Sequence, residues 1–226
     1  MWTLTIEDFA LRQTLEHVDI RTSGCRERLA IVVAVMRKRN SDRPLASFYN
    51  CMKPLSQSQK IFCIGLSRTG TTSLHVALTR LGFRSCHYPP LHRLPEIMEC
   101  YDAVGDTPVA CSFRELDAEY PGSRFVLTVR EIRSWLASTE RFFSGQPLPV
   151  EGWRREVRLK TYGVLQWDRE AFEAAYYRHF KTVLAHFRCR RNELLIIDIT
   201  AGQGWDVLCP FLEVAEPDDK FPHEKY

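Results

Sequence analysis

The chain has 226 residues, of which 45% are hydrophobic and 26% are charged, as in an ordinary globular protein with room for one α/β domain and a substantial core. Its formal net charge is +3, and the positive excess is concentrated in the first 60 residues. The nearly neutral remainder argues against a nucleic-acid-binding surface.

The first 59 residues differ from the rest of the chain. They are basic and only weakly periodic, and they end in a polar, proline-containing stretch at residues 40–54. They contain no recognisable catalytic or binding motif. We therefore predict an N-terminal extension, helical or partly disordered, over residues 1–59 and a folded domain over residues 60–226.

The most informative segment begins at residue 60. Residues 60–64 form a short apolar run typical of a buried parallel strand, and apolar residues recur at helical spacing after Thr71. Between them, residues 65–72 read Gly-Leu-Ser-Arg-Thr-Gly-Thr-Thr. Such a turn directs backbone amides and the positive end of the helix toward one point, which suits phosphate binding.

The spacing of this turn is close to that of a Walker A loop, G-x-x-x-x-G-K-[ST], but Thr71 stands at the lysine position. The positive charge lies inside the loop instead, at Arg68. The missing lysine weakens the prediction of an ATPase and leaves that of phosphate binding intact. The alternative is that Gly65 and Gly70 only make a tight connection between the strand and the helix.

The rest of the chain alternates between strand and helix patterns. Further strands are predicted at residues 83–88, 124–129 and 194–199, and a turn at residues 104–108. Further helices are predicted at residues 91–101, 112–120 and 131–143, in a long segment capped by Asp168, and at residues 204–212. Repeated βα units imply a parallel sheet with helices on both faces and ligands at the carboxyl ends of the strands.

A second candidate anion site follows the strand at residues 124–129. Arg130 stands where this strand stops, and Ser138 lies eight residues later on the next helix. An arginine presents a planar fork to phosphate, and a serine hydroxyl adds another donor. The alternative for an arginine at a strand end is that it caps carbonyl groups or pairs with carboxylates.

Together these motifs resemble the sulfotransferase family of P-loop proteins, which use 3′-phosphoadenosine 5′-phosphosulfate (PAPS). The similarity is closest to a branch with the patterns G-x-x-R-T-G-T-T-S-L, G-D-T-P and Y-P-G-S-(K/R)-F-(I/V)-L-T-V-R-x-x-x-S-W, here at residues 65–74, 105–108 and 120–135. The branch's closing D-x-T-A-G-x-G-W-x-x-L-C-x-F-L and F-P-H patterns match residues 198–212 and 221–223. The resemblance implies a three-layer α/β/α P-loop fold with a mostly parallel sheet.

The resemblance also implies an activity. A sulfuryl group would pass in line from PAPS to a hydroxyl or amine of a small-molecule or glycan acceptor, releasing adenosine 3′,5′-bisphosphate. Fixed donors aimed at the developing charge would carry most of the catalysis. The implied cofactor-binding residues are Ser67, Arg68, Thr69, Gly70, Thr71, Thr72, Arg130 and Ser138, with Arg68 also catalytic. The family does not generally require a metal for this step, and we expect none.

Two residues are candidates for the general base that activates the acceptor. His87 ends the second predicted strand, and Asp106 lies in the Gly-Asp-Thr-Pro motif. The alternatives are a half-buried histidine bonded to backbone and an aspartate that only forms a turn. The sequence leaves both open, and likewise whether Trp205 approaches the adenine or packs in the core.

Two other functions compete with sulfuryl transfer. In a P-loop kinase or NTPase, residues 194–198 would be a Walker B strand whose Asp198 holds magnesium, although Thr71 then leaves the phosphates without their usual lysine. In a non-catalytic relative, the fold would serve only as a binding module. The intact set of phosphate-binding residues argues against this second alternative.

The eight cysteines form no C-x-x-C pair, which disfavours a zinc ribbon or a thioredoxin-type site and favours a reducing compartment. The apolar run at residues 29–36 is too short to span a bilayer and too far from the terminus for a signal peptide. We therefore expect a cytoplasmic protein that has no transmembrane segment and does not bind nucleic acid.

Overall fold

The computed structural model describes residues 59–149 and 151–224, so the predicted extension lies, except for Gln59, outside the described residues. The described chain folds around a five-stranded sheet in the order β2-β3-β1-β4-β5, in which every pairing is parallel. The strands are β1 (Ile61–Cys63), β2 (Ser85–His87), β3 (Ala103–Gly105), β4 (Arg124–Thr128) and β5 (Leu194–Ile197).

Helices follow the strands as predicted from the alternating pattern. The α-helices are α3 (Thr71–Arg80), α4 (Leu94–Cys100), α5 (Thr107–Ala110), α6 (Phe113–Glu119), α7 (Ile132–Ser144), α8 (Gly152–Tyr162), α9 (Arg169–His186) and α10 (Trp205–Leu212). Short 3₁₀ turns are η1 (Leu91–Arg93), η2 (Arg191–Glu193) and η3 (Ile199–Ala201). The predicted cap of the long helix is confirmed, because the Asp168 carboxylate accepts a 2.8 Å hydrogen bond from the Ala171 amide.

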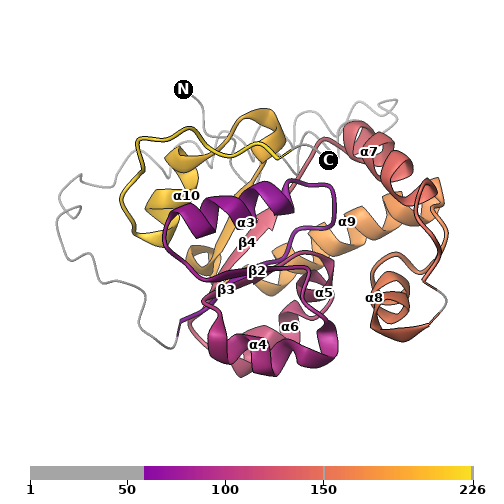
Figure 1. Ribbon diagram of the computed structural model, residues 1–226, viewed down its shortest axis with the longest axis horizontal. Helices are drawn as coiled ribbons and strands as arrows, with labels where there is room; N and C mark the ends of the chain where they lie inside the picture. Colours follow the sequence, from indigo (N-terminus) through magenta and orange to yellow (C-terminus); the bar gives the residue numbers. More distant parts are fainter. Residues whose placement is uncertain (1–58, 150, 225–226) are drawn as a thin grey trace, which may run out of the picture. The chain divides into compact units, whose positions relative to one another are not determined.

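The predicted α/β fold with a parallel sheet is confirmed, and successive residues of β1 build the core on its two faces. Ile61 and Cys63 pack with α3 and α10 in one apolar cluster. Phe62 points to the opposite face, where its ring lies 5.2 Å from that of Phe125, which in turn meets Phe187 after α9. Figure 1 shows α3 on one side of the sheet and α4 and α6 on the other.

One predicted element is wrong. Residues 104–108 were expected to form a turn, but Val104 lies in β3 and pairs with Phe62 and Cys86. Helix α5 begins at Thr107, with Pro108 in its first turn. The connection is therefore compressed to Asp106, which has φ 80° and ψ −175°. The glycine, aspartate and proline do mark a change of direction, but the strand before it is too short to recognise from its pattern.

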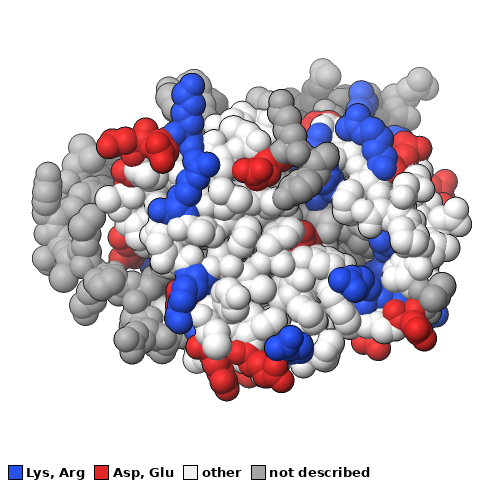
Figure 2. Space-filling view, viewed as in Figure 1, with Lys and Arg blue, Asp and Glu red and all other residues white. Residues whose placement is uncertain are grey.

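The surface of the domain is mixed in charge. On the face shown in Figure 2, basic and acidic side chains are interspersed around a largely uncharged centre. Among the described residues, none of the helices combines the length and the apolar character needed to cross a bilayer.

Candidate active site

The carboxyl ends of four neighbouring strands meet at one large cleft. The loop after β1, His87 of β2, Asp106 after β3 and Arg130 after β4 all contribute to its wall, and its volume is about 1110 Å³. Parallel strands bring these ends to one edge of the sheet, where ligands of such folds bind. Most of the predicted site residues line the cleft: Ser67, Arg68, Gly70, Thr71, Thr72, His87, Asp106, Arg130 and Ser138.

The glycine loop at residues 65–70 has the compact shape expected of an anion-binding turn. Gly65 lies against β4 so closely that a β-carbon there would overlap the Thr128 hydroxyl. Arg68 and Gly70 both adopt left-handed backbone conformations, with φ of 73° and 100°. The Gly70 carbonyl then accepts the first bond of α3, from the Leu74 amide at 3.0 Å. The positive end of α3 thus faces the cleft.

Thr69 is the one predicted binding residue that does not line the cleft. Its side chain is 1% exposed, donates to the Leu66 carbonyl at 2.6 Å and lies 2.6 Å from the Thr128 hydroxyl. On the same loop, the indole N–H of Trp135 donates to the Ser67 carbonyl at 3.0 Å. These contacts fix the loop to the domain from behind, so Thr69 shapes the site with its side chain directed inward.

A buried polar network connects the glycine loop to β2 and β3. Ser67 Oγ donates to Asp106 Oδ1 at 2.6 Å, and Thr71 Oγ1 donates to Asp106 Oδ2 at 2.9 Å. His87 Nε2 lies 3.0 Å from Asp106 Oδ2 and 3.3 Å from Thr71 Oγ1. Asp106 also accepts from the amide and hydroxyl of Thr107. The two candidate bases are therefore direct partners.

The environment of Asp106 keeps it ionised. Burial alone raises the pKa of this carboxyl, but the hydrogen bond and charge of His87 and the hydroxyls of Ser67 and Thr107 lower it to about 2. Such a carboxylate only accepts hydrogen bonds, so the proton of a neutral His87 ring lies on Nε2. Nδ1 is then the ring atom left to accept a proton. A group with so low a pKa is a poor general base near neutral pH.

The arginine and serine of the second motif meet the glycine loop directly. Arg68 Nε donates to Ser138 Oγ at 3.3 Å, and Arg130 Nη1 donates to the Arg68 carbonyl at 3.3 Å. Tyr176 holds the Arg130 backbone by donating to its carbonyl at 2.6 Å. Burial and the nearby charge of Arg68 lower the pKa of Arg130. Two guanidinium groups thus lie close together in a cleft wall.

Two residues with alternative sequence interpretations lie elsewhere. Asp198, the possible Walker B residue, accepts hydrogen bonds from Thr200 Oγ1 at 2.6 Å and the Ala201 amide at 3.0 Å, within the turn that follows β5. Trp205 is 5% exposed, packs 4.6 Å from the Phe221 ring and donates to the Asp219 carbonyl at 2.7 Å. Trp205 is therefore a core residue of α10.

Several residues of the cleft wall are not predicted from the sequence as site residues. They come from the residue after β2, the end of α7, the following loop, α8 and the C-terminal segment: Tyr88, Arg141, Phe143, Leu148, Arg154, Arg158, His223 and Glu224. Two signals were available in the sequence: His223 lies in the F-P-H pattern, and on α8 Arg154 and Arg158 are four residues apart and so share a helix face. The functional assignment of that face requires knowing what it packs against.

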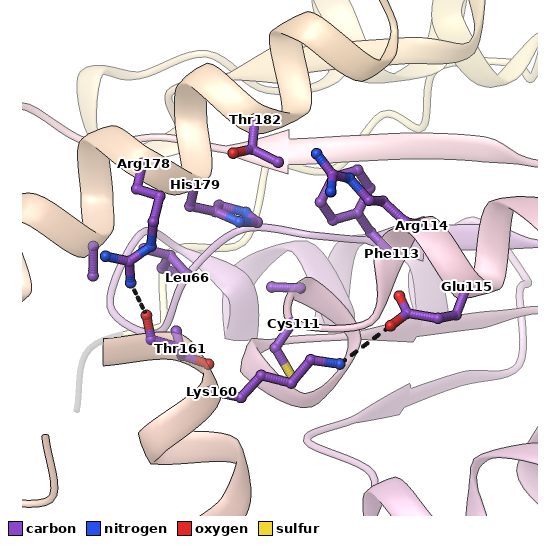
Figure 3. Close-up of a pocket in the computed structure, with 12 residues that line it drawn as sticks. Leu66, Cys111, Phe113, Arg114, Glu115, Lys160, Thr161, Arg178, His179 and Thr182 are labelled. Atoms are coloured by element: carbon purple, nitrogen blue, oxygen red, sulfur yellow. Dashed lines mark hydrogen bonds and ion pairs between the residues drawn. The ribbon is translucent and has the colours of Figure 1, made fainter. Parts of the chain in front are cut away.

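A second, smaller cavity of about 280 Å³ lies where α8 approaches α6 and α9. Figure 3 shows two contacts that cross it. Lys160 forms a 3.3 Å ion pair with Glu115, and Arg178 donates to the Thr161 carbonyl at 2.8 Å. Both fasten the last turn of α8 to the body of the domain.

Comparisons with known proteins show what this chain is similar to. A family model described as "Sulfotransferase domain" matches residues 60–226. The chain is also similar to "Ava biosynthesis cluster protein M" of Aspergillus versicolor, with 26% identity over 212 residues that cover 73% of this chain and 80% of that protein. The family match spans all the strands and helices described above.

Proposed function

This chain belongs to the sulfotransferase domain family, and on that premise we propose that it transfers a sulfuryl group from PAPS to a hydroxyl or amine of a small-molecule or glycan acceptor. Adenosine 3′,5′-bisphosphate is the second product. The proposal assigns this activity to residues 60–226 and treats residues 1–59 as an appended extension. The free thiols of the six described cysteines support a cytoplasmic location as part of the same proposal.

The observation that carries the proposal is the meeting of two anion-binding groups in one cleft. The glycine loop and α3 offer backbone amides and Arg68, while Arg130 follows β4 and Ser138 lies on α7 in the wall of the same cleft. Arg68 touches both, through Ser138 Oγ and through its own carbonyl. A nucleotide with a phosphate at each end of its ribose fits this donor set, because anions between the two arginines would relieve the repulsion between their charges.

PAPS supplies the sulfuryl group and, in its bisphosphate portion, the leaving group. The glycine loop and Arg68 would hold the phosphosulfate and stabilise the charge that develops on it. Arg130 and Ser138 would hold the 3′-phosphate, which ATP lacks. In the transfer, an acceptor oxygen or nitrogen bonds to sulfur as the bond between sulfur and the bridging oxygen breaks.

His87 would accept the proton that the acceptor loses. Its side chain is 26% exposed and lines the cleft, and Asp106 and Thr71 hold its Nε2 edge. Nδ1 would take the proton, while the Asp106 carboxylate fixes the ring and stabilises the positive imidazolium that results. We therefore propose His87 as the base and Asp106 as the residue that positions it.

A turnover assay tests this function. The protein is incubated with PAPS labelled in its sulfuryl group and a pool of hydroxyl and amine metabolites, and mass spectrometry detects compounds that gain the label. His87→Asn should abolish the gain, whereas the matched control His92→Asn, on an exposed residue outside the cleft, should keep it. Bisphosphate binding without any labelled product across the pool would instead favour a non-catalytic binding protein.

A thermal-shift titration separates this function from that of a kinase. Adenosine 3′,5′-bisphosphate should raise the melting temperature without magnesium, since its binding energy comes from amides and arginines. Stabilisation by Mg-ATP alone would favour the NTPase. The position of Asp198 supports sulfuryl transfer, because its carboxylate already serves the turn after β5.

A further inference from the structure

Helix α8 and the loop before it form a wall of the cleft that contains none of the proposed nucleotide-binding residues. Arg154 and Arg158 lie one helical turn apart on α8, and both line the cleft. At about 1110 Å³, the cleft is larger than the roughly 300–1,000 Å³ usual for one small ligand. The cleft therefore has room for an acceptor beside the nucleotide.

Aromatic rings connect this wall to the proposed base. Tyr88 directly follows His87, and its ring lies 5.3 Å from that of Trp153 on α8. The Arg154 guanidinium lies 4.7 Å from the centre of the Trp153 ring. Farther along α8, the Arg158 guanidinium lies 4.5 Å from the Phe143 ring. An acceptor hydroxyl held at His87 would thus have an aromatic surface next to it and two positive charges beyond.

The cations of the cleft fall into two electrostatic groups. Burial and then Asp106 raise the pKa of Tyr88, while Arg154 and Arg158 act against that rise. The positive neighbours that act on Arg130 are instead Arg68 and Arg141. Charges act most strongly at short range. The arginines of α8 therefore act on the Tyr88 side of the cleft, while Arg68 and Arg141 act on the proposed nucleotide site.

Arg158 and the turn of α8 that follows it are held in place by contacts with the rest of the domain. Arg158 Nη1 donates to the Leu165 carbonyl at 2.8 Å, which leaves its other nitrogens for a ligand. The contacts of Lys160 and Thr161 in Figure 3 tie the following turn to α6 and α9. A side chain positioned in advance loses little entropy on binding, so Arg158 is suited to grip an anionic group.

We propose that the acceptor is an aromatic alcohol that carries a carboxylate, with its ring against Tyr88 and its carboxylate at Arg154 and Arg158. This inference rests on the proposed sulfuryl transfer and adds the class of the acceptor. The exposed Leu148 and its neighbouring prolines supply apolar contact at the mouth of the same cleft. The acceptor hydroxyl then points to His87, where its proton leaves.

The test compares two ligands that differ by one carboxylate, 2-naphthol and 6-hydroxy-2-naphthoate. Isothermal titration calorimetry measures the affinity of each for the full chain saturated with adenosine 3′,5′-bisphosphate. The carboxylate should strengthen binding about tenfold or more, as charge-assisted hydrogen bonds do. Arg154→Ala and Arg158→Gln should each remove most of that preference. Arg155→Ala, on an exposed residue of α8 outside the cleft, is the matched control and should retain it.

The remaining outcomes are equally decisive. Equal affinity for the two ligands, a preference for the neutral one, or no binding of the naphthoate overturns the acceptor assignment. Weaker binding of the bisphosphate in Arg154→Ala also overturns it, because Arg154 would then belong to the nucleotide site. Failure of the wild-type chain to bind the bisphosphate at all is a different result, which contradicts the proposed function itself.

Discussion

Replacement of Asp106 by asparagine isolates the charge that positions the proposed base. Asparagine has nearly the same size and shape as the aspartate that already adopts the positive φ of this position. It keeps one acceptor oxygen but has no negative charge. The perturbation therefore leaves the fold of the β3–α5 connection in place and removes the ionic partner of His87 Nε2.

The size of the effect follows from the pKa of Asp106. A fall from 3.8 to about 2 corresponds to roughly 2 kcal/mol that the folded site contributes to the ionised carboxylate. His87 is the main source of this stabilisation, so the imidazolium formed during the reaction loses an interaction of similar size. A loss of roughly 2 kcal/mol in the transition state lowers kcat about thirtyfold.

The same substitution changes the dependence of stability on pH. The lowered pKa of Asp106 gives stability that is complete above about pH 4, the pKa in the unfolded chain, and is lost as pH falls toward about 2. Urea unfolding between pH 7 and pH 3 measures this loss. Asp106→Asn should lose stability less steeply than the wild type below pH 4, because asparagine does not titrate.

Two assays together test the effect of Asp106→Asn on catalysis. Steady-state kinetics gives kcat, and calorimetry with the bisphosphate confirms that the nucleotide site is intact. If Asp106→Asn has the kcat of the wild type and the same acid slope, the charge of Asp106 neither supports His87 nor stabilises the fold, and the reasoning is refuted.

Other substitutions test the scaffold of the cleft. Gly65→Ala should abolish bisphosphate binding and cost about 1–3 kcal/mol, because its β-carbon would overlap the Thr128 hydroxyl; normal calorimetry would show that the loop tolerates the change. Thr69→Val should cost about 1–2 kcal/mol in urea unfolding through its two buried bonds, and an unchanged midpoint would refute that role. Trp205→Phe should lower the free energy of unfolding by about 1 kcal/mol without weakening the binding of the bisphosphate. Weaker bisphosphate binding in this variant would instead favour adenine stacking as the role of Trp205.

The βα order and the glycine loop are predictable from the sequence because their signals are local. A buried apolar run, a glycine-rich turn and a helix start lie next to one another at residues 60–74. Asp168 likewise caps a helix that it directly precedes. Strand β3 gives no such signal, because it has only three residues, and the Gly-Asp-Thr-Pro sequence at its end has the composition of a turn.

The arrangement of the site depends on contacts that the sequence does not encode locally. Asp106 reads as a possible base, yet its hydrogen-bond partners Ser67 and Thr71 lie 39 and 35 residues away, and His87 and Ser67 help to keep it ionised. Arg68 reaches Ser138 across 70 residues. The role of Arg158 emerges only when α8 packs beside the cleft. The sequence shows which residues are charged, and tertiary packing decides what each charge faces.

The central claim is that a single nucleotide bridges the glycine loop and Arg130, and calorimetry with adenosine 3′,5′-bisphosphate and adenosine 5′-phosphate tests it most directly. The bisphosphate should bind the wild type about tenfold or more tightly than the monophosphate. Arg130→Ala should erase that advantage, whereas Arg133→Ala, on the exposed side of α7, should preserve it. Equal affinities in the wild type, or an advantage that survives in Arg130→Ala, would contradict the account.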